Sequence, residues 1–353
     1  MMSKKRKVLF ILPTLRAGGA EKIISFVSHT IDNSRFDSKL LIIGPQTDAA
    51  YETDPKITYF LNKSRVLVAI PQVVLFLIKY KPDVVLSSIG HLNTIMGLIS
   101  PIFPKTKFII REASVISSFK KFIKKNNLYD YLSKKSYPMV DAVICQSKDM
   151  ANDFRILYNI PSDKLFIINN PITRRKDTTL EPKISNDVKQ FITIGRLSPE
   201  KGHEPLLRML SKINIDFHYT IVGDGPERET LLELIQELGL SDKITHIAYT
   251  NNAYPYLRAS DILLQGSYVE GFPNVVLESC SVGTPVIAFD VPGGTKEIII
   301  HDINGFLVNE ESEFIRFLTL FKDWQKKTIM DSVKDRFSEK TILGQYERLF
   351  ERI

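Results

Sequence analysis

The sequence predicts an α/β protein with two doubly wound parallel sheets in tandem. Short, nearly continuous apolar runs alternate with amphipathic segments, one polar stretch interrupts this alternation, and the alternation then starts again. Continuous rather than alternating hydrophobicity indicates strands that are buried on both faces, as in a parallel sheet covered by helices. The length of 353 residues agrees with two domains, because a domain has roughly 100–200 residues.

The first half contains six apolar runs with the length of buried strands. Between the first two lies "GAEKIISFVSHTI" (19–31), whose apolar residues have helical spacing. This order of strand, helix and strand predicts a Rossmann-like domain over residues 1–172. The six predicted strands are 7–13, 38–44, 82–88, 107–112, 141–147 and 164–171.

A polar stretch, "PITRRKDTTLEPKISND" (171–187), separates the two halves. It has two prolines and no apolar period, so we expect an interdomain linker over 173–188.

The alternation of strands and helices restarts after this linker and predicts a second Rossmann-like domain over 189–335. The stretch from about 311 to 353 has helical spacing and many charges, and we expect a final helix, 336–353, that packs back on the first domain. The two domains are expected to face each other across a cleft, and ligands of such sheets bind beyond the carboxyl ends of the strands. The predicted strands here are 190–196, 217–225, 243–249, 261–267 and 284–290.

The composition is that of an ordinary globular protein with a basic excess. Hydrophobic residues make up 44%, charged residues 25%, and the net charge is +7. The two cysteines, Cys145 and Cys280, lie in apolar stretches and are expected to be buried, reduced thiols of a cytoplasmic protein. No secretory signal is expected, and the most apolar run, 66–78, is too short for the ~20 residues of a spanning helix.

Neither a metal site nor a nucleic-acid module is predicted. The six histidines form no HExxH pair, and the chain has no DxD triplet, the usual metal ligand of many transferases. The basic charge is compatible with nucleic acid, anionic lipid or phosphate ligands, but no nucleic-acid-binding motif is present. We therefore expect cationic side chains in the loops to neutralise any bound diphosphate.

Gly18 and Gly19 follow the first predicted strand and lead into a helix. Paired glycines let the backbone approach a ligand, and the helix N-terminus favours an anion. The spacing is not GxGxxG, which disfavours a dinucleotide site. The alternative is a plain turn from strand to helix.

The loop "GRLSPEKG" (195–202) follows the first strand of the second domain. Its two cations, Arg196 and Lys201, lie five positions apart at a strand end, where they are placed to converge on a diphosphate. Solvated surface charges are the alternative.

His91 lies just past a predicted strand end in "SSIGHLNTIMG" (87–97). Histidine exchanges protons near neutral pH, so this position predicts a site residue. A structural histidine is the alternative.

The stretch "YVEGFPNVVLESC" (268–280) places two glutamates around a helix start at a strand's carboxyl end. Gly271 allows a sharp turn, Pro273 suits the start of a helix, and the N–H groups near Phe272, Asn274 and Val275 favour an anion. Glu270 precedes this start and Glu278 lies about one turn inside it. A phosphate site with a carboxylate on either side for hydroxyls describes a sugar nucleotide, and a helix with acids by chance is the alternative.

The segment "FKKFIKKNNLYDYLSKK" (119–135) is basic, aromatic and amphipathic. It predicts a peripheral contact with an anionic membrane surface, with an ordinary surface helix as the alternative.

Several of these motifs together resemble the retaining family-4 glycosyltransferases of the GT-B fold. The resemblance rests on "GGAEK", "GRLSPEKG", "IVGDGPERETL" and the long stretch from "SYVEGFPNVVLESC" to "HDINGFLV". It covers nearly the whole chain in order and is most specific over 190–308. EGFPNxxxE is its strongest single element.

The resemblance implies a role for each site residue. Glu278 would bind the ribose hydroxyls, Glu270 would contact the donor sugar, and Arg196 with Lys201 would hold the diphosphate. The backbone of the loop would line the sugar and phosphates, through Gly271, Phe272, Pro273, Asn274 and Val275. Pro273 has no N–H group and would only shape the loop. Gly18 and Gly19 would approach the diphosphate from the first domain, and His91 would lie near the reacting sugar.

The implied function is retaining transfer of a hexose or N-acetylhexosamine from a UDP-sugar, without cofactor or metal. The acceptor would be a saccharide or a polyprenyl-diphosphate-linked saccharide in capsule, lipopolysaccharide or related synthesis, at the inner face of the plasma membrane. Ser279 departs from the family pattern, which often has alanine at this position. Tyr268 and Val269 lie on the sugar side of the motif. Two alternatives stay open: another sugar-nucleotide enzyme, such as an epimerase or hydrolase, and a silent binding subunit of a polysaccharide assembly complex.

Overall fold

The computed structural model describes residues 4–122, 126–173, 188–250, 252–320 and 322–353. The chain divides into two compact units. Unit 1 comprises Met1–Ser117, Lys124–Pro171 and Glu339–Ile353, and unit 2 comprises Ser118–Ile123 and Ile172–Ser338.

The units differ in detail from the predicted domains. Residues 118–123 group with unit 2, although the prediction placed them in the first domain, and the ring of Phe122 stacks on that of Tyr268 with 5.7 Å between centroids. Residues 174–187 of the predicted linker lie outside the described residues. The predicted boundaries therefore stay predictions.

Unit 1 contains a seven-stranded parallel sheet in the order β3-β2-β1-β4-β5-β6-β7. Its strands are β1 (Arg6–Leu12), β2 (Phe36–Ile42), β3 (Thr58–Phe60), β4 (Val84–Ser88), β5 (Lys107–Arg111), β6 (Ala142–Cys145) and β7 (Leu165–Ile167). Its helices are α1 (Gly19–Thr30), α2 (Val66–Tyr80), α3 (Gly90–Ile99), α5 (Asn127–Ser136), α6 (Lys148–Tyr158) and α14 (Glu339–Arg352), while α4 (Ile116–Phe119) spans the division between the units.

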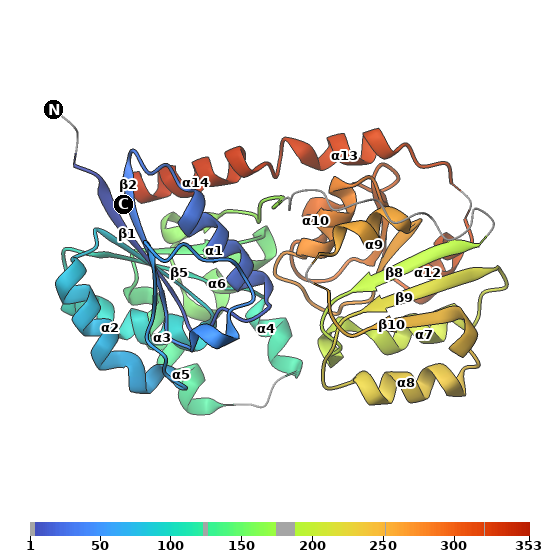
Figure 1. Cartoon of the computed structure of the whole chain (residues 1–353), viewed down its shortest axis with the longest axis horizontal. Coiled ribbons are helices and arrows are strands. Elements are labelled where there is room, and N and C mark those ends of the chain that lie inside the picture. The colour runs from blue at the N-terminus through green and yellow to red at the C-terminus, as the bar shows by residue number, and fades with distance from the viewer. Residues whose placement is uncertain (1–3, 123–125, 174–187, 251, 321) are drawn as a thin grey trace. The chain divides into compact units, whose positions relative to one another are not determined.

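Helices cover both faces of this sheet because the chain winds outward from β1 in both directions. Right-handed crossovers then place α1 on one face and the helices of the β4-to-β7 half on the other. Figure 1 shows α1 and α14 on one side of the sheet and α2, α3 and α5 on the other.

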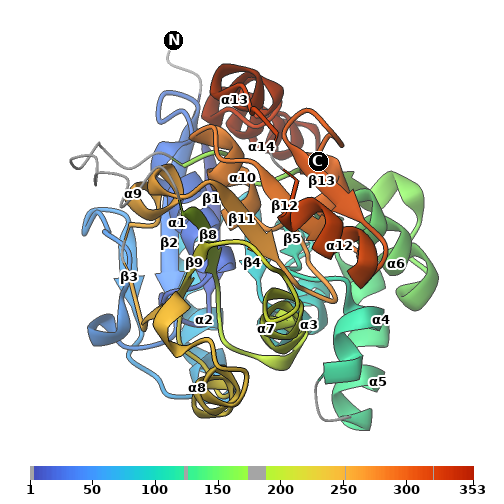
Figure 2. The same ribbon diagram turned by 90° about the vertical axis from the view of Figure 1, so that its right-hand side faces the viewer.

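Unit 2 contains a six-stranded parallel sheet in the order β10-β9-β8-β11-β12-β13. Its strands are β8 (Lys189–Ile194), β9 (Phe217–Val222), β10 (Ile244–Ile247), β11 (Ile262–Gln265), β12 (Val286–Phe289) and β13 (Gly305–Val308). Its helices are α7 (His203–Leu210), α8 (Arg228–Glu237), α9 (Tyr254–Ala259), α10 (Asn274–Ser281), α11 (Thr295–Ile298), α12 (Glu311–Leu318) and α13 (Lys326–Lys334). Figure 2 shows β8, β11, β12 and β13 one beside the next.

The predicted fold class, with two doubly wound parallel sheets, is confirmed. Each of the eleven predicted strand segments contains a strand, and the sequence missed two: β3 and β13. β3 has only three residues, and β13 follows a turn in "DINGFLV" that masks its short apolar run. Short 3-10 helices join the elements: Gln46–Asp48, Ser100–Ile102, Lys120–Phe122, Tyr137–Met139, Ser162–Lys164, Pro199–Lys201 and Ser241–Lys243.

The apolar run 66–78 forms most of α2, a helix of 15 residues with Pro71 in its interior. Its buried side, which includes Val73 and Leu77, faces the unit, and other side chains are exposed. Within the described ranges, no helix has both the length and the hydropathy that a membrane span requires.

The two cysteines are free and buried, as expected from the sequence. Cys145 ends β6, and Cys280 lies inside α10. Burial raises the pKa of both thiols, that of Cys280 to about 12, which keeps it protonated at neutral pH.

The predicted return of the chain's last helix to the first domain is confirmed by α14. Tyr346, Leu349 and Phe350 join the core of unit 1, and the Phe350 ring lies 5.9 Å from Phe10 and 6.1 Å from Phe36, centroid to centroid. α14 thus completes one face of the β1 half of the sheet.

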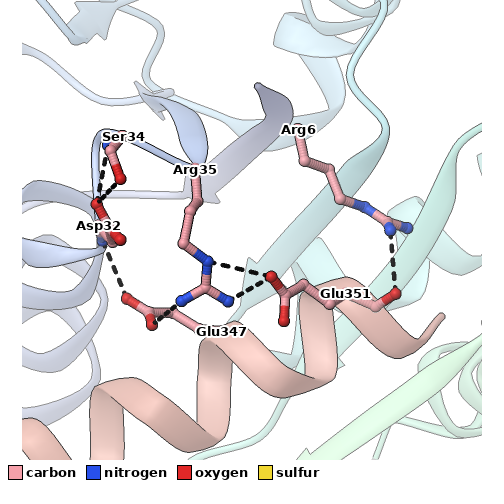
Figure 3. Close-up of polar contacts among 6 residues, drawn as sticks. All are labelled: Arg6, Asp32, Ser34, Arg35, Glu347 and Glu351. Carbon is pink, nitrogen blue, oxygen red and sulfur yellow. Dashed lines mark hydrogen bonds and ion pairs between the residues drawn. The ribbon is translucent and has the colours of Figure 1, made fainter. Parts of the chain in front are cut away.

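Charged groups at the edge of this interface fix the position of α14 (Figure 3). The guanidinium of Arg35 bridges Glu347, at 3.0 Å, and Glu351, while the backbone N–H of Asp32 donates to Glu347 at 3.0 Å. Arg6 donates to the carbonyl of Glu351. Arg35 and Glu351 are largely exposed, so these pairs set the register of the helix more than its stability.

We expect Phe350→Ala to lower the free energy of unfolding of unit 1 by about 3–5 kcal/mol, because it empties a fully buried site between two rings. Arg35→Ala, the control at the exposed edge, should cost only about 0–1 kcal/mol. Urea titration followed by far-UV circular dichroism measures both. Equal losses of stability in the two variants would contradict the conclusion that buried packing stabilises α14 more than the exposed ion pairs do.

Candidate active site

The predicted donor residues lie on three neighbouring loops at the carboxyl ends of parallel strands in unit 2. Arg196 and Lys201 follow β8, the stretch from Glu270 to Asn274 follows β11, and a glycine pair follows β12. β8, β11 and β12 are adjacent in the sheet, so these loops meet at one edge.

Glu270 and Lys201 are in direct contact. The Nζ of Lys201 lies 2.6 Å from Oε1 of Glu270, and the same oxygen accepts hydrogen bonds from Ser267 Oγ at 2.7 Å and from Gln265 Nε2 at 3.1 Å. The Glu270 residue is only 8% exposed. Because a buried carboxylate needs partners, these three donors stabilise Glu270 and fix its orientation.

Two glycines that the sequence interpretation gave no role hold the loops together. Gly202 has a φ of +61°, and a Cβ there would lie 2.1 Å from the carbonyl oxygen of Gly266. Gly293 has a φ of +131°, and its Cβ would lie 1.7 Å from the carbonyl oxygen of Glu270. Any other residue at these positions would push the loops apart, so the backbone contact itself requires glycine.

The helix after Glu270 starts one residue later than Pro273. α10 begins at Asn274, and Pro273 is the preceding cap residue, whose carbonyl accepts from Leu277 N–H at 3.3 Å. The positive end of the helix dipole lies at this N-terminus, which favours an anion. Glu278 lies four residues after the start of α10, and a helix rises about 1.5 Å per residue, so it is about one turn inside the helix. The Glu278 residue is buried, with 8% exposure.

Gly271 and Phe272 connect Glu270 to this helix. The carbonyl of Gly271 accepts from Gly294 N–H at 2.9 Å, and the buried Phe272 ring packs against Phe337 at 5.4 Å. Phe272 therefore anchors the loop through its side chain.

Arg196 lies on the exposed surface of its loop, and its guanidinium makes no hydrogen bond or ion pair with the described residues. Its carbonyl accepts a 3.0 Å hydrogen bond from Nε2 of His203, a buried residue that the sequence interpretation missed. Burial lowers the pKa of His203, and the charge of Lys201 lowers it further. Neutral His203 thus holds the loop that carries both predicted cations.

We expect His203 to make the protein less stable in acid. Its pKa is lowered in the folded state, so the unfolded chain binds more protons, and stability is lost as pH falls below the ordinary histidine value of about 6.5. Thermal melts from pH 8 to pH 5 should show a steeper loss for the wild type than for His203→Gln. Parallel curves would contradict this role, and the comparison cancels contributions from other groups.

The remaining predicted residues lie in unit 1. Gly18 has an extended backbone and precedes α1, which begins at Gly19. The N–H of Gly18 donates to Tyr51 Oη at 2.9 Å, and this hydroxyl donates to the Gly18 carbonyl. His91 is the second residue of α3, directly after β4. Partial desolvation lowers the pKa of His91, so its imidazole is neutral at pH 7.

His91 lines a cavity of about 820 Å³ within unit 1. The wall comes from the segments after β1, β2 and β4, from the start of α2, and from α1, α3 and α5. It is mostly apolar and carries a few charges at its rim, including Arg16, which pairs with Asp48 at 2.7 Å. The lining residues are Pro13, Thr14, Arg16, Glu21, Ile43, Gly44, Pro45, Asp48, Lys63, Ser64, Arg65, Val66, Leu67, Ile89, His91, Thr94, Ile95, Asn126, Leu128, Tyr129 and Leu132.

A buried acid network lies near this wall and was not foreseen from the sequence. Glu112 accepts hydrogen bonds from Tyr137 Oη at 2.6 Å and Asn93 Nδ2 at 2.7 Å. Complete burial raises the pKa of Glu112. Gly90, at the start of α3, leaves room for Tyr129 Oη, which would lie 2.4 Å from a Cβ at that position. The two hydrogen bonds of Glu112 therefore tie α3, which carries His91, to the end of β5 and to the 3-10 turn Tyr137–Met139.

The segment 119–135, predicted to contact a membrane, is not one continuous helix. Residues 119–122 end α4 and form a 3-10 turn, residues 123–125 lie outside the described residues, and α5 starts at Asn127. Leu128, Tyr129 and Leu132 of α5 line the cavity. The apolar side of α5 is therefore partly used by the protein itself, and the membrane contact of this segment stays a prediction.

Within the described ranges, no group of three or more His, Cys, Asp and Glu side chains is arranged to hold a metal ion.

Two family models match consecutive parts of the chain. "Glycosyltransferase Family 4" matches residues 17–176, and "Glycosyl transferases group 1" matches residues 175–328. The two matches meet near the predicted linker and together cover most of both units.

Similar proteins include bacterial glycosyltransferases. The chain is 26% identical, over 90% of its length and 91% of the relative's, to the N-acetylgalactosamine-N,N'-diacetylbacillosaminyl-diphospho-undecaprenol 4-alpha-N-acetylgalactosaminyltransferase of Campylobacter jejuni. It is 23% identical, over 87% and 86%, to the amylovoran biosynthesis glycosyltransferase AmsD of Erwinia amylovora.

The chain also shares its fold with solved structures. Anabaena Alr3699/HepE, solved in complex with UDP, superimposes with a TM-score of 0.80 at 21% identity, covering 98% of this chain and 100% of that one. Two doubly wound sheets, the ordered EGFPNxxxE loop and both family matches agree: the chain belongs to the family-4 glycosyltransferases of the GT-B fold.

Proposed function

We propose that the protein is a retaining hexosyltransferase that moves a hexose or N-acetylhexosamine from a UDP-sugar to a saccharide or lipid-linked acceptor in cell-surface polysaccharide synthesis. The observation that carries this proposal is the Lys201–Glu270 contact at the meeting point of the unit 2 loops. In this contact, the cation that we assign to the phosphates, Lys201, lies beside the carboxylate that we assign to the sugar hydroxyls, Glu270.

The donor is assigned to unit 2. None of the three hydrogen-bond donors to Glu270 reaches its Oε2, which leaves that oxygen available for a hydroxyl of the donor sugar. We assign Glu278, one turn inside α10, to the ribose hydroxyls, and the N-terminus of α10 to the phosphates, which the helix dipole favours. The UDP complex of a protein with the same fold supports the choice of nucleotide.

The acceptor is assigned to the cavity of unit 1. A volume of about 820 Å³ falls within the usual range of about 300–1,000 Å³ for small-molecule sites. Its mostly apolar wall, with Lys63 and Arg65 among the lining residues, agrees with a diphosphate that carries a prenyl chain. The Campylobacter jejuni relative is named for transfer to a diphospho-undecaprenol-linked saccharide, which supports a lipid-linked acceptor here.

The reaction follows from charge development. The sugar acquires oxocarbenium character while negative charge grows on the leaving UDP phosphate. Arg196 and Lys201 stabilise that charge, so we propose transfer without a metal. The acceptor hydroxyl attacks from the face that the phosphate leaves, and its proton passes to the leaving phosphate, which retains the configuration at the anomeric carbon.

The test is UDP release measured with a panel of UDP-sugars, with and without a polyprenyl-diphosphate-linked saccharide, in the presence of EDTA. We expect release that depends on both substrates and that EDTA does not abolish. Release without the acceptor would indicate a hydrolase instead, and the absence of both release and UDP binding would indicate a silent subunit.

A further inference from the structure

α2 presents an exposed apolar face that nothing in the described part of the chain covers. Leu67 is 69% exposed, Val68 59%, Leu75 49% and Ile78 53%. Together with the exposed Pro71, they define the α2 apolar face. At about 100° per residue these positions fall within one arc of the helix, opposite the side that packs on the sheet.

Such a face is unusual for a surface helix of a soluble unit. Exposed positions of a surface helix are normally polar or charged, and contiguous apolar patches mark interaction sites. The sequence from 66 to 78 contains no charged residue at all. The hydrophobicity of α2 therefore needs a partner that is itself apolar.

The charged residues within 61–82, which contain α2 and its flanks, are all cationic, and the next residue, Asp83, accepts a hydrogen bond from the backbone N–H of Lys7 at 2.8 Å. Lys63 and Arg65 precede the helix, Lys79 lies in its last turn, and Lys81 follows it; residues 61–82 contain no Asp or Glu. The α2 apolar face therefore lies between two pairs of cations. It is complementary to a surface that has an apolar interior and anionic groups.

We propose that the α2 apolar face docks on an anionic lipid bilayer. The helix lies in the plane of the interface, with Leu67, Leu75 and Ile78 inserted among the acyl chains, and its terminal cations contact the lipid phosphates. Its 15 residues are too few for the ~20 that a spanning helix needs, which agrees with a helix lying flat on the surface.

The docking face adjoins the unit 1 cavity. Leu67 belongs to the face and also lines the cavity, and Leu128 of α5, 68% exposed, lines the same cavity. The cavity therefore opens beside the bilayer, where a lipid-anchored acceptor enters without leaving the membrane. This last step rests on the proposed function, whereas the docking of α2 does not.

Flotation of the full-length protein with vesicles tests the docking. We expect binding to phosphatidylcholine vesicles that contain phosphatidylglycerol, and a loss of about tenfold or more in Leu75→Asp/Ile78→Asp, since each inserted side chain contributes apolar burial. Ile156→Asp is the matched control: Ile156 is 67% exposed on α6, beside the opposite edge of the same sheet. It should bind as the wild type does.

A second pair of variants tests the charges. Lys79→Gln/Lys81→Gln should weaken binding to the anionic vesicles by about fivefold per lysine and have little effect on vesicles of phosphatidylcholine alone. Neither lysine lines the cavity.

The proposal would be overturned if Leu75→Asp/Ile78→Asp bound the vesicles as well as the wild type does. It would also be overturned if the wild-type protein did not float with the vesicles. A wild-type dimer in sedimentation that the same variant dissociates, without vesicle binding, would assign the face to a second copy instead. Near-wild-type UDP release by the variant with a short-chain, water-soluble acceptor separates a docking defect from a failure of the proposed transfer reaction.

Discussion

Replacing Glu270 with alanine is expected to lower sugar transfer at least about a hundredfold and to leave UDP binding largely intact. The substitution removes the carboxylate assigned to the donor sugar and frees Lys201, whose Nζ lies 2.6 Å from it. The nucleotide contacts assigned to Glu278 and the first turn of α10 remain. Steady-state kinetics and UDP titration calorimetry measure the two effects.

Glu270→Gln is the control that separates chemistry from folding. Glutamine keeps the shape, so the hydrogen bonds from Ser267 and Gln265 have an acceptor oxygen, but it loses the charge that pairs with Lys201. We expect a melting temperature closer to wild type than that of Glu270→Ala, with transfer still strongly reduced. Turnover equal to the wild type in both variants would refute the role of Glu270.

Replacing Lys201 with alanine is expected to lower kcat by about 10²–10³-fold. It removes a cation assigned to the leaving diphosphate and leaves the buried Glu270 carboxylate without its ion-pair partner. Lys212→Ala provides the matched control, because Lys212 is an exposed lysine of the same unit that pairs with Glu311 at 3.6 Å. Its kcat should stay within a small factor of the wild type.

The double variant of Glu270 and Lys201 distinguishes a coupled pair from two independent groups. Because the two side chains touch, their effects on kcat/KM should be far from additive. Strict additivity would show that each acts alone and would contradict the geometry given to the site.

The sequence predicts the fold well because the strands of both sheets are buried on both faces and read as unbroken apolar runs. β3 and β13 escaped because three or four residues after a turn carry too little pattern. The exposure of α2 also escaped: its run 66–78 is apolar on every side, so the pattern cannot tell the face that packs from the face that stays open.

The site was predicted in its parts and not in its contacts. The sequence identified Glu270 and Lys201 as ligands of different groups, but they lie 69 positions apart, and only the adjacency of β8 and β11 brings them together. His203 escaped because a lone histidine after "KG" has no pattern. Gly293 escaped because the need for glycine arises from a carbonyl on a distant loop.

Unit 1 shows the same limit. His91 was predicted from its place after a strand, and the structure puts it on the cavity wall. The cavity itself depends on side chains from five separate segments, and the Glu112 network depends on a carboxylate that the sequence shows only as the end of a strand. No local spacing encodes either of them.

The configuration of the transferred sugar tests the central claim most directly. The protein is incubated with a UDP-α-sugar and a polyprenyl-diphosphate-linked saccharide, and the anomeric proton of the product is read by NMR. A new α-glycosidic bond, formed as UDP appears and without added metal, is the predicted result. A β-linked product, or free sugar with no transfer, would contradict the account.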